Sequence, residues 1–331
     1  AGSILAPLWK SQPDHPGLAH YIIHTYDYPA LAAEASEAAR GYASIAPSAA
    51  HAQHMPSHIF TRTGLWRESV AANRRSVDIA LGTSSIAEAL HALDYSMYAY
   101  LQMRQPAEAK AIVDRLPGLA ARFDVNAVTG AAPGSAGVFA LAAIPARYAL
   151  EREAWPEAAA LEPKHSDFPW TEAMTYFARA LGASRMGNPA IARTAIDSLA
   201  AIRDRLAAKE PYWSEQVAIQ HLAAQAWLDL AEGRKDTALA RMTAAASRED
   251  ATEKNAVTPG PLAPARELLG DMLLALGKPS DALAEYEKTL AKEPNRYRAL
   301  VGAARAAERS HNAPREKELR AKIRELTKMK A

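Results

Sequence analysis

The chain has 331 residues, with 39 Lys+Arg against 37 Asp+Glu, and it contains no Cys. This near balance of charge argues against a nucleic-acid-binding surface, which is usually strongly basic. Without Cys, disulfides, thiolate catalysis and Cys-ligated zinc or iron–sulfur sites are excluded. The apolar runs are far shorter than the roughly 18 residues that a membrane-spanning helix needs, so we expect no membrane span.

The composition favours helices along the whole chain. Ala, Leu, Glu and Arg are abundant, aromatic residues make up only 7%, and alternating strand-like runs are scarce. Turn signals separate the helical stretches in chain order, at Thr63-Gly64, Gln105-Pro106, Gly187-Asn188-Pro189, Gly233-Arg234 and Gly277-Lys278-Pro279. A small residue recurs at intervals of 34 to 49 residues, at Ala35, Ser69, Ala109, Ala158, Ala192, Ala238 and Ala282. We therefore expect a repeated pair of helices.

The most regular unit runs from Pro264 to Pro294 and resembles the tetratricopeptide (TPR) repeat. Gly270, Ala282 and Tyr286 stand at repeat positions 8, 20 and 24, and Pro294 stands at 32. Small residues at 8 and 20 let the two helices approach closely, and Pro at 32 ends the second helix. The resemblance implies an all-α fold, a TPR-type α-solenoid that forms a right-handed superhelix of about seven to eight antiparallel helix pairs.

One solenoid over residues 1–331 is expected, because a single helix pair cannot bury its apolar face alone. It comprises His-rich repeats at 15–104, middle repeats at 105–246, and C-terminal repeats with polar capping helices at 247–331. Irregular stretches at about 123–135, 163–170 and 247–263 are longer than ordinary turns between repeats. Long loops on a rigid scaffold often carry function.

Histidines gather on one face of the first three units. The TPR resemblance places positions 2, 5, 9, 12 and 13 of each first helix in the concave groove, and steps of three or four keep side chains on one face. Six of the ten histidines occupy such positions: His20, His24, His51, His54, His58 and His91. Asp27, Arg62, Asp94 and Tyr98 share this face. A His pair at positions 5 and 9 occurs twice in the same register, in the first and second units.

This spacing indicates a metal site, because His-x3-His presents two imidazoles one helical turn apart. The pairs His20–His24 and His54–His58 are expected on adjacent helices, roughly 8–10 Å apart, where they can converge on one ion. Further ligands, or partners that orient an imidazole, are His51, His91, Asp27 and Asp94. Imidazole and carboxylate without sulfur suit Zn, Cu, Ni, Mn or Fe.

Two other interpretations of the cluster stay open. A single His on an interior helix face is more often structural than a ligand, and these rings can instead hydrogen-bond across the groove to acids and tyrosines. Clustered imidazoles can also form a pH-responsive or anion-binding patch, because an ordinary imidazole takes up a proton near pH 6.

The later repeats place charged side chains on the same groove face. Glu267 and Asp271 stand at positions 5 and 9 of the most regular unit, where superhelix closure can bring them opposite the histidines. They can equally form a solvated acidic helix start. Arg147 can bind an anionic group or pair with Glu151 one turn on. The predicted ligand-groove residues are Tyr98, Arg62, Arg147, Glu267 and Asp271.

Two histidine motifs extend the resemblance from TPR repeats in general to one group of TPR proteins. HPGLAHYIIHTYD from His15 and HAQHMPSHIFTRTG from His51 resemble a group of bacterial TPR proteins, as does the segment 249–270. Members are commonly longer at the N-terminus and often carry an export signal. The resemblance and the lack of Cys imply the C-terminal portion of a periplasmic or exported protein, with a cytoplasmic location as the alternative.

Two functions of different classes follow, and we favour the first. The first is a binding scaffold whose groove holds a peptide, a protein or a small molecule, or the N-terminal part of the same chain, beside a metal. The second is a metal-dependent enzyme, with the two His pairs as ligands and open coordination positions. Its candidate catalytic residues for proton transfer are Asp27, Asp94 and His91.

Overall fold

The computed structural model describes residues 1–328, all of them in helices and the loops between them. The last three residues of the predicted C-terminal section, 329–331, lie outside the described residues. The helices are α1 (Gly2–Ser11), α2 (Pro16–Thr25), η1 (Ala32–Ala35), α3 (Ser36–Ile45), α4 (Ala50–His54), α5 (Pro56–Arg62), α6 (Trp66–Gly82), α7 (Ile86–Gln102), α8 (Pro106–Ala120), α9 (Gly134–Glu151), α10 (Trp155–Ala160), α11 (Pro169–Arg185), α12 (Pro189–Leu206), α13 (Pro211–Ala231), α14 (Lys235–Asp250), α15 (Ala265–Ala275), α16 (Pro279–Lys292), α17 (Tyr297–Arg309) and α18 (Ala313–Thr327). The predicted all-α class is confirmed.

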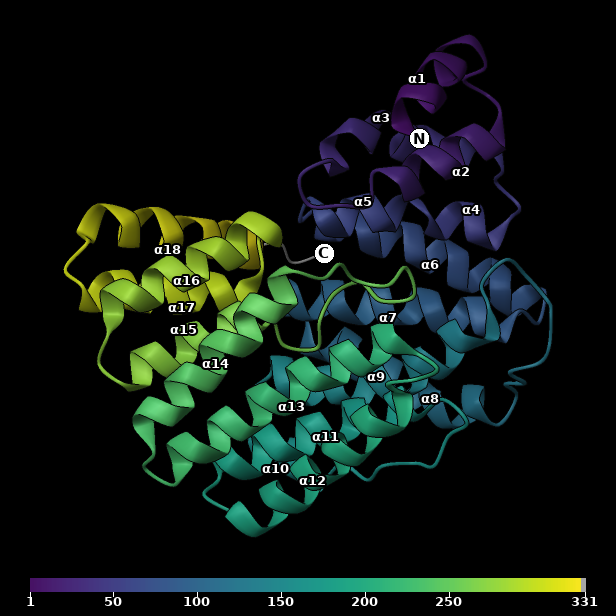
Figure 1. Ribbon diagram of the computed structural model, residues 1–331. Helices are drawn as coiled ribbons and strands as arrows, with labels where there is room; N and C mark the ends of the chain where they lie inside the picture. The colour runs from purple at the N-terminus through teal and green to yellow at the C-terminus, as the bar shows by residue number, and fades with distance from the viewer. Residues whose placement is uncertain (329–331) are drawn as a thin grey trace.

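Consecutive helices pack in pairs, and each pair packs on the next. Contacts are dense within the pairs α11/α12, α13/α14 and α15/α16, and again between pairs at α6/α7, α12/α13 and α16/α17. The stack curves, so that α14 to α18 return toward the N-terminal half (Figure 1). No helix within residues 1–328 is long and apolar enough to cross a membrane.

Small residues allow this close packing. All seven recurring small residues identified in the sequence, from Ala35 to Ala282, are fully buried. Gly270 packs against the ring of Tyr286, and a Cβ at Gly270 would lie only 2.8 Å from that ring. The expected logic of the repeat, a small residue facing an aromatic one, is therefore present in the most regular unit.

The turn between α5 and α6 joins the two ends of the stack. Gly64 has a φ of +69°, and a Cβ there would lie 2.3 Å from the backbone oxygen of Pro294. Trp66 donates its indole N–H to the backbone oxygen of Asn295 at 3.0 Å, and the Asn295 amide donates to Gly64 O at 3.3 Å. These contacts close the groove by placing the α16–α17 turn against the His-rich repeats.

Three long loops interrupt the helices, near the predicted irregular stretches. They cover residues 121–133, 161–168 and 251–264. The third, which we call the α14–α15 loop, runs beside α7 on the inside of the curved stack (Figure 1).

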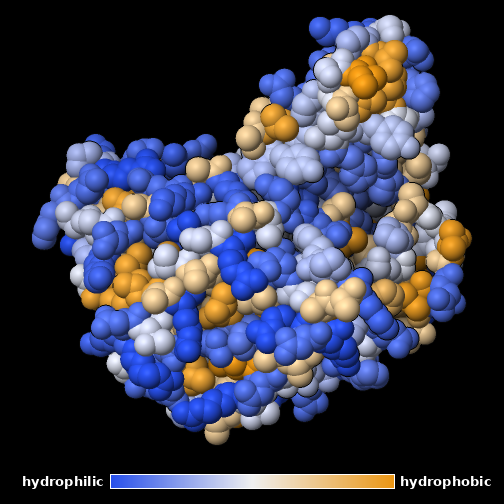
Figure 2. Space-filling view, in the orientation of Figure 1, coloured by the Kyte–Doolittle hydropathy of each residue, from blue (hydrophilic) through white to orange (hydrophobic). Residues whose placement is uncertain are grey.

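On the outer surface, apolar side chains gather at the N-terminal end, where Ile4, Leu8 and Tyr21 are exposed (Figure 2).

Candidate metal centre

Six histidines come together where the first three repeats meet. α2 carries His20 and His24, α4 carries His51 and His54, α5 carries His58, and α7 carries His91. They form two groups of three, in each of which one ligand atom per residue lies within 4.8 Å of the others. We call His20, His24 and His51 the outer triad, which is half-buried, and His54, His58 and His91 the inner triad, which is buried. The two predicted His-x3-His pairs belong to different triads, and each pair gains a third His.

The inner triad is enclosed, and two of its nitrogens already have the spacing of metal ligands. His54, His58 and His91 are only 2%, 1% and 5% exposed. The Nε2 atoms of His54 and His58 lie 3.1 Å apart. In a tetrahedral site with Zn–N bonds of about 2.0–2.1 Å, two ligand nitrogens are roughly 3.3 Å apart. The pair therefore needs almost no movement to hold an ion.

Hydrogen bonds determine which nitrogen of each ring carries a hydrogen. Asn73 on α6 donates its Nδ2 to the backbone oxygen of Ser69 at 2.7 Å, so its Oδ1 faces His54 Nδ1 at 2.6 Å and accepts from it. His58 Nδ1 lies 2.9 Å from a carboxylate oxygen of Asp27, which only accepts. In the neutral rings both Nε2 atoms are then bare. Two lone pairs face each other, and a cation between them relieves their repulsion.

Burial keeps the inner rings from taking up a proton. Desolvation lowers the pKa of His54, His58 and His91 well below the ordinary value of 6.5, and neighbouring imidazoles lower it further. The hydrogen bond from His58 to Asp27 opposes this effect without reversing it. In the outer triad, burial lowers the pKa of His20 and His51 to about 4. These directions argue against the pH-responsive interpretation, which needs rings that charge near pH 6.

His91 supplies a third nitrogen to the inner triad. Its Nδ1 is buried and has no hydrogen-bond partner among the described residues. Burial lowers the pKa of this ring, and a hydrogen bond with the backbone of Val257 partly opposes the shift. The neighbouring carbonyls of Ala256 and Thr258 accept from the Tyr95 hydroxyl at 3.3 and 3.0 Å. The α14–α15 loop therefore packs directly against the inner triad.

The outer triad is more open and less constrained. The ring centroid of His20 lies 4.6 Å from that of His24 and 5.2 Å from that of His51. His51 Nδ1 lies 4.0 Å from a carboxylate oxygen of Glu88. Within the part of the chain that the structure describes, the side chains of His20 and His24 make ring contacts but no hydrogen bond.

The two predicted carboxylates have different environments. Asp27 accepts from His58, from Arg62 Nε at 2.8 Å and from Lys254 Nζ at 2.7 Å. Although burial alone would raise it, the pKa of Asp27 is held well below its ordinary value by these partners. Asp27 therefore stays ionised and orients His58. Asp94 is buried beside Arg147, 3.2 Å away, and its described contacts involve no histidine.

The predicted groove residues Arg62, Tyr98 and Arg147 bind other parts of the chain. Arg62 also pairs with Glu253 at 3.3 Å. Tyr98 donates to Glu293 at 2.6 Å and accepts from Arg296 at 2.9 Å. Arg147 donates to the backbone oxygens of Gly260 and Pro261 at 3.3 and 3.0 Å. These partners lie in the α14–α15 loop and the C-terminal repeats, in addition to Asp27 and Asp94 in the N-terminal repeats.

Glu267 and Asp271 hold C-terminal repeats together. Both carboxylate oxygens of Glu267 accept from Arg296, at 2.7 and 3.0 Å. Asp271 accepts from Arg298 at 2.8 Å and from the Tyr286 hydroxyl at 2.6 Å. Neither residue is a solvated helix start, and neither has a described contact with the histidines.

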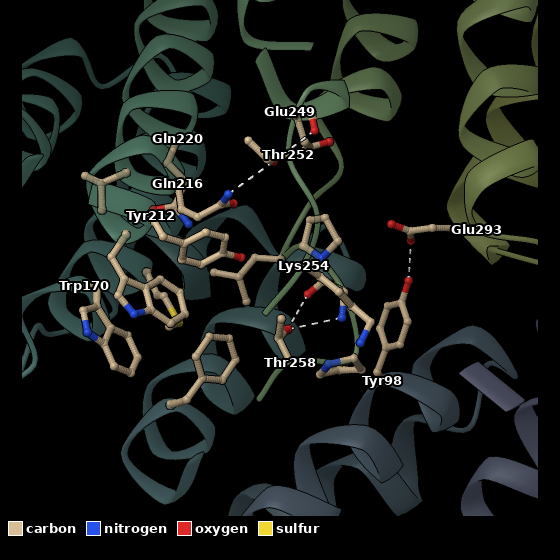
Figure 3. Close-up of a pocket in the computed structure, with 18 of the residues that line it drawn as sticks. Tyr98, Trp170, Tyr212, Gln216, Gln220, Glu249, Thr252, Lys254, Thr258 and Glu293 are labelled. Atoms are coloured by element: carbon tan, nitrogen blue, oxygen red, sulfur yellow. Dashed lines mark hydrogen bonds between the residues drawn. The ribbon is translucent and has the colours of Figure 1, made fainter. Parts of the chain in front are cut away.

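A pocket lies between the α14–α15 loop and helices α11 and α13 (Figure 3). Its space, part of it open to solvent, measures about 870 Å³. Trp170 and Trp213 stack on one wall with ring centroids 4.2 Å apart and planes 11° apart. Polar side chains that line the pocket include Gln216, Gln220, Glu249, Thr252 and Lys254. Because Lys254 also contacts Asp27, one loop side chain links the pocket to the partner of His58.

Sequence reasoning missed three residues around the inner triad: Asn73, Tyr95 and Lys254. Asn73 lies on the second helix of its repeat, which the register does not assign to the groove, and only its complete burial marks it. Tyr95 follows Asp94 directly, one position off the predicted groove stripe. Lys254 belongs to the segment 249–270, which the family resemblance singled out without a role.

Comparisons with known proteins find similarity of fold only. No family model and no curated protein matches the chain. The crystal structure of the P58(IPK) TPR domain is similar over 98% of this chain and 87% of that one, with 12% identity and a TM-score of 0.28. The structure of Naa15/Naa10 bound to HypK-THB matches with 13% identity and a TM-score of 0.27. This match covers 98% of the chain but 60% of the other protein. The similarity to TPR-repeat proteins is thus distant.

Proposed function

We propose that this protein is a TPR-like scaffold that holds a transition-metal ion in its inner triad. The observation that carries the proposal is the pair of bare Nε2 atoms on His54 and His58, 3.1 Å apart, whose other nitrogens are bound by Asn73 and Asp27. Proteins orient metal-binding histidines by just such hydrogen bonds to the second ring nitrogen. The buried, unpartnered Nδ1 of His91 completes a three-nitrogen donor set. Three imidazoles suit Zn, Cu, Ni or Fe better than Mn.

The ligand of the scaffold is a small molecule in the pocket beside the α14–α15 loop. Arg147 and Tyr95 bind backbone carbonyls of this loop, so the space that an extended peptide would take is filled by the chain itself. The stacked Trp170 and Trp213 offer an apolar wall, and Gln216 and Gln220 offer amide groups. A mostly apolar pocket with a few polar groups is typical of small-molecule sites.

A metal-dependent enzyme is the second candidate function. The presence of three imidazole ligands is the observation that supports it. Catalytic zinc sites commonly use three protein ligands and leave a fourth position for water or substrate. Of the three candidate catalytic residues, His91 would be a ligand and Asp27 would orient His58, while Asp94 pairs with Arg147. Export to the periplasm and membership of the bacterial group with the two histidine motifs are part of the proposal.

The test is the metal content of the untagged chain after incubation with Zn²⁺ and dialysis. We expect His91→Gln to abolish tight binding, because it removes one of the three ligand nitrogens. The matched control is His165→Ala/His311→Ala, two exposed histidines outside the cluster. Circular dichroism would show that each variant is folded. Tight binding that survives in folded His91→Gln and His54→Gln would refute the proposal.

A further inference from the structure

We infer that the outer triad is a second metal site, weaker and faster to exchange than the inner one, and that it loads the inner triad. The inference rests on the proposed function of the inner triad and extends it. It assigns separate tasks to the two His-x3-His pairs, one to capture an ion at the surface and one to retain it.

The outer triad has the donors of a metal site. One nitrogen from each of His20, His24 and His51 lies within 4.8 Å of the others. The carboxylate of Glu88 lies 4.0 Å from His51 Nδ1 and adds negative charge beside the donors. All three rings are half-buried, so an ion can reach them from solvent. Imidazoles with access to water are suited to Zn²⁺ and similar ions.

The difference in affinity follows from what holds the rings. In the inner triad, Asn73 and Asp27 orient His54 and His58 by hydrogen bonds of 2.6 and 2.9 Å. The side chains of His20 and His24 have no such partner among the described residues, so an ion must also order them. Removing an orienting partner typically costs 10–100-fold in metal affinity. We therefore expect the outer site to bind Zn²⁺ about 10–100-fold more weakly than the inner site.

The two triads touch at two places, which provide a route. The ring centroids of His24 and His58 lie 5.6 Å apart, and those of His51 and His54 lie 6.2 Å apart. One ion can bridge nitrogens up to about 4.2 Å apart, twice the Zn–N bond length. The less constrained His24 ring is the one whose rotation would bring a nitrogen toward His58 and the inner triad. Transfer is then a ligand exchange, in which a bond to an inner nitrogen forms as a bond to an outer nitrogen breaks and the ion stays divalent.

The route matters because the inner triad is closed elsewhere. Its three rings are at most 5% exposed, and the α14–α15 loop packs against them through Val257 and through Thr258, which accepts from Tyr95 on α7. The pairing of Lys254 with Asp27 anchors the same loop at 2.7 Å. An ion that avoided the outer triad would have to displace this loop.

The experiment titrates the untagged full chain with Zn²⁺ against a chromophoric chelator and compares three proteins. They are the wild type, the outer variant His20→Ala/His51→Ala, and the inner variant His91→Gln. We expect two equivalents in the wild type, loss of the weaker one in the outer variant, and loss of the tighter one in the inner variant. The His165→Ala/His311→Ala control keeps both. If the outer variant unfolds by circular dichroism, His20→Gln replaces it.

Loading is measured separately, by stopped-flow mixing with less than one equivalent of Zn²⁺. We expect the outer variant to fill the inner site at least tenfold more slowly, at unchanged final affinity. Unchanged stoichiometry or an unchanged loading rate in a folded outer variant overturns the inference and leaves the proposed function intact. A single equivalent that only the outer variant loses overturns the proposed function instead, and no bound Zn²⁺ in the wild type overturns both.

Discussion

Two regions of this molecule carry titratable pairs at the same groove positions of their repeats, and they serve different ends. His54 and His58 stand at positions 5 and 9 of the second unit, and Glu267 and Asp271 stand at the same positions of the most regular C-terminal unit. The histidines face each other through bare nitrogens, 3.1 Å apart. The acids are bound by arginines at 2.7–3.0 Å.

The difference lies in the partners rather than in the positions. Burial raises the pKa of Glu267, but Arg296 and Arg298 outweigh it, so the net pKa is lowered and the carboxylate stays charged. Around the inner triad, hydrogen bonds to Asn73 and Asp27 use one nitrogen of His54 and of His58, and the two remaining nitrogens face only each other among the described residues. A groove position therefore indicates a site only where its side chain keeps an unsatisfied donor or acceptor.

The largest effect is expected from breaking the C-terminal pairing. Glu267→Ala leaves the buried Arg296 without its bidentate partner, although Glu151 at 2.7 Å remains beside it. Loss of one member of a buried ion pair costs about 3–5 kcal/mol of unfolding free energy, and we expect a loss near the lower end of this range. Urea denaturation of the variant and the wild type measures this loss. Glu318→Ala, on the exposed face of α18, is the control and should change stability little. A cost near that of the control would show that the acid is not structural.

A slightly smaller effect is expected from adding metal. At 100 times the dissociation constant, Zn²⁺ should raise the free energy of unfolding by about 2.7 kcal/mol, because it binds only the folded chain. The gain should fall to at most about 1.4 kcal/mol in His91→Gln, in which only the weaker outer triad remains, and should persist in Asp271→Asn. Thermal and urea unfolding with and without Zn²⁺ measure it. An equal gain in His91→Gln would place the bound ion outside the inner triad.

The next prediction compares the Zn²⁺ affinities of two variants, one at each of the two aspartates predicted from the sequence. Asp27→Asn weakens the acceptor that orients His58, so Zn²⁺ affinity should fall by roughly 10–100-fold. Asp94→Asn should leave it unchanged, since Asp94 pairs with Arg147. Chelator competition on the folded variants compares them. Equal losses in both variants would mean that charge in the groove, not orientation of His58, sets the affinity.

The smallest effect concerns Glu249, a carboxylate that lines the pocket and has no arginine partner among the described residues. Burial is the main cause that raises its pKa from 4.5 to about 7. An acid with a raised folded pKa favours the folded state when protonated, so its contribution is lost as pH rises from about 4.5 through 7. The full shift corresponds to about 3.4 kcal/mol, and solvent screening reduces it because Glu249 is only half-buried. Glu249→Gln should therefore stabilise the protein by about 1–2 kcal/mol at pH 8 and leave it unchanged at pH 4. Urea denaturation at both pH values tests the sign.

Much of the fold was predictable because it depends on local spacing. The recurring small residues from Ala35 to Ala282, the turn signals and the three irregular stretches all have their counterparts in the structure. Helical periodicity also placed six histidines on one face. Their division into two triads was not predictable, because His51 and His91 join their triads through the angles at which α2, α4 and α7 pack.

The sequence by itself determined the helices, their pairing and the face that carries the histidines, since each depends on residues within one repeat. Only the tertiary structure decided which polar side chains have a hydrogen-bond or ion-pair partner. Tyr98 meets Glu293 and Trp66 meets Asn295 across 195 and 229 residues of chain, and Lys254 reaches Asp27 across 227. Such contacts depend on the closure of the whole stack, which sums small rotations over every repeat. That closure brings the α14–α15 loop against the inner triad, whereas the acids of the last regular unit take their arginines from the adjoining α16–α17 segment.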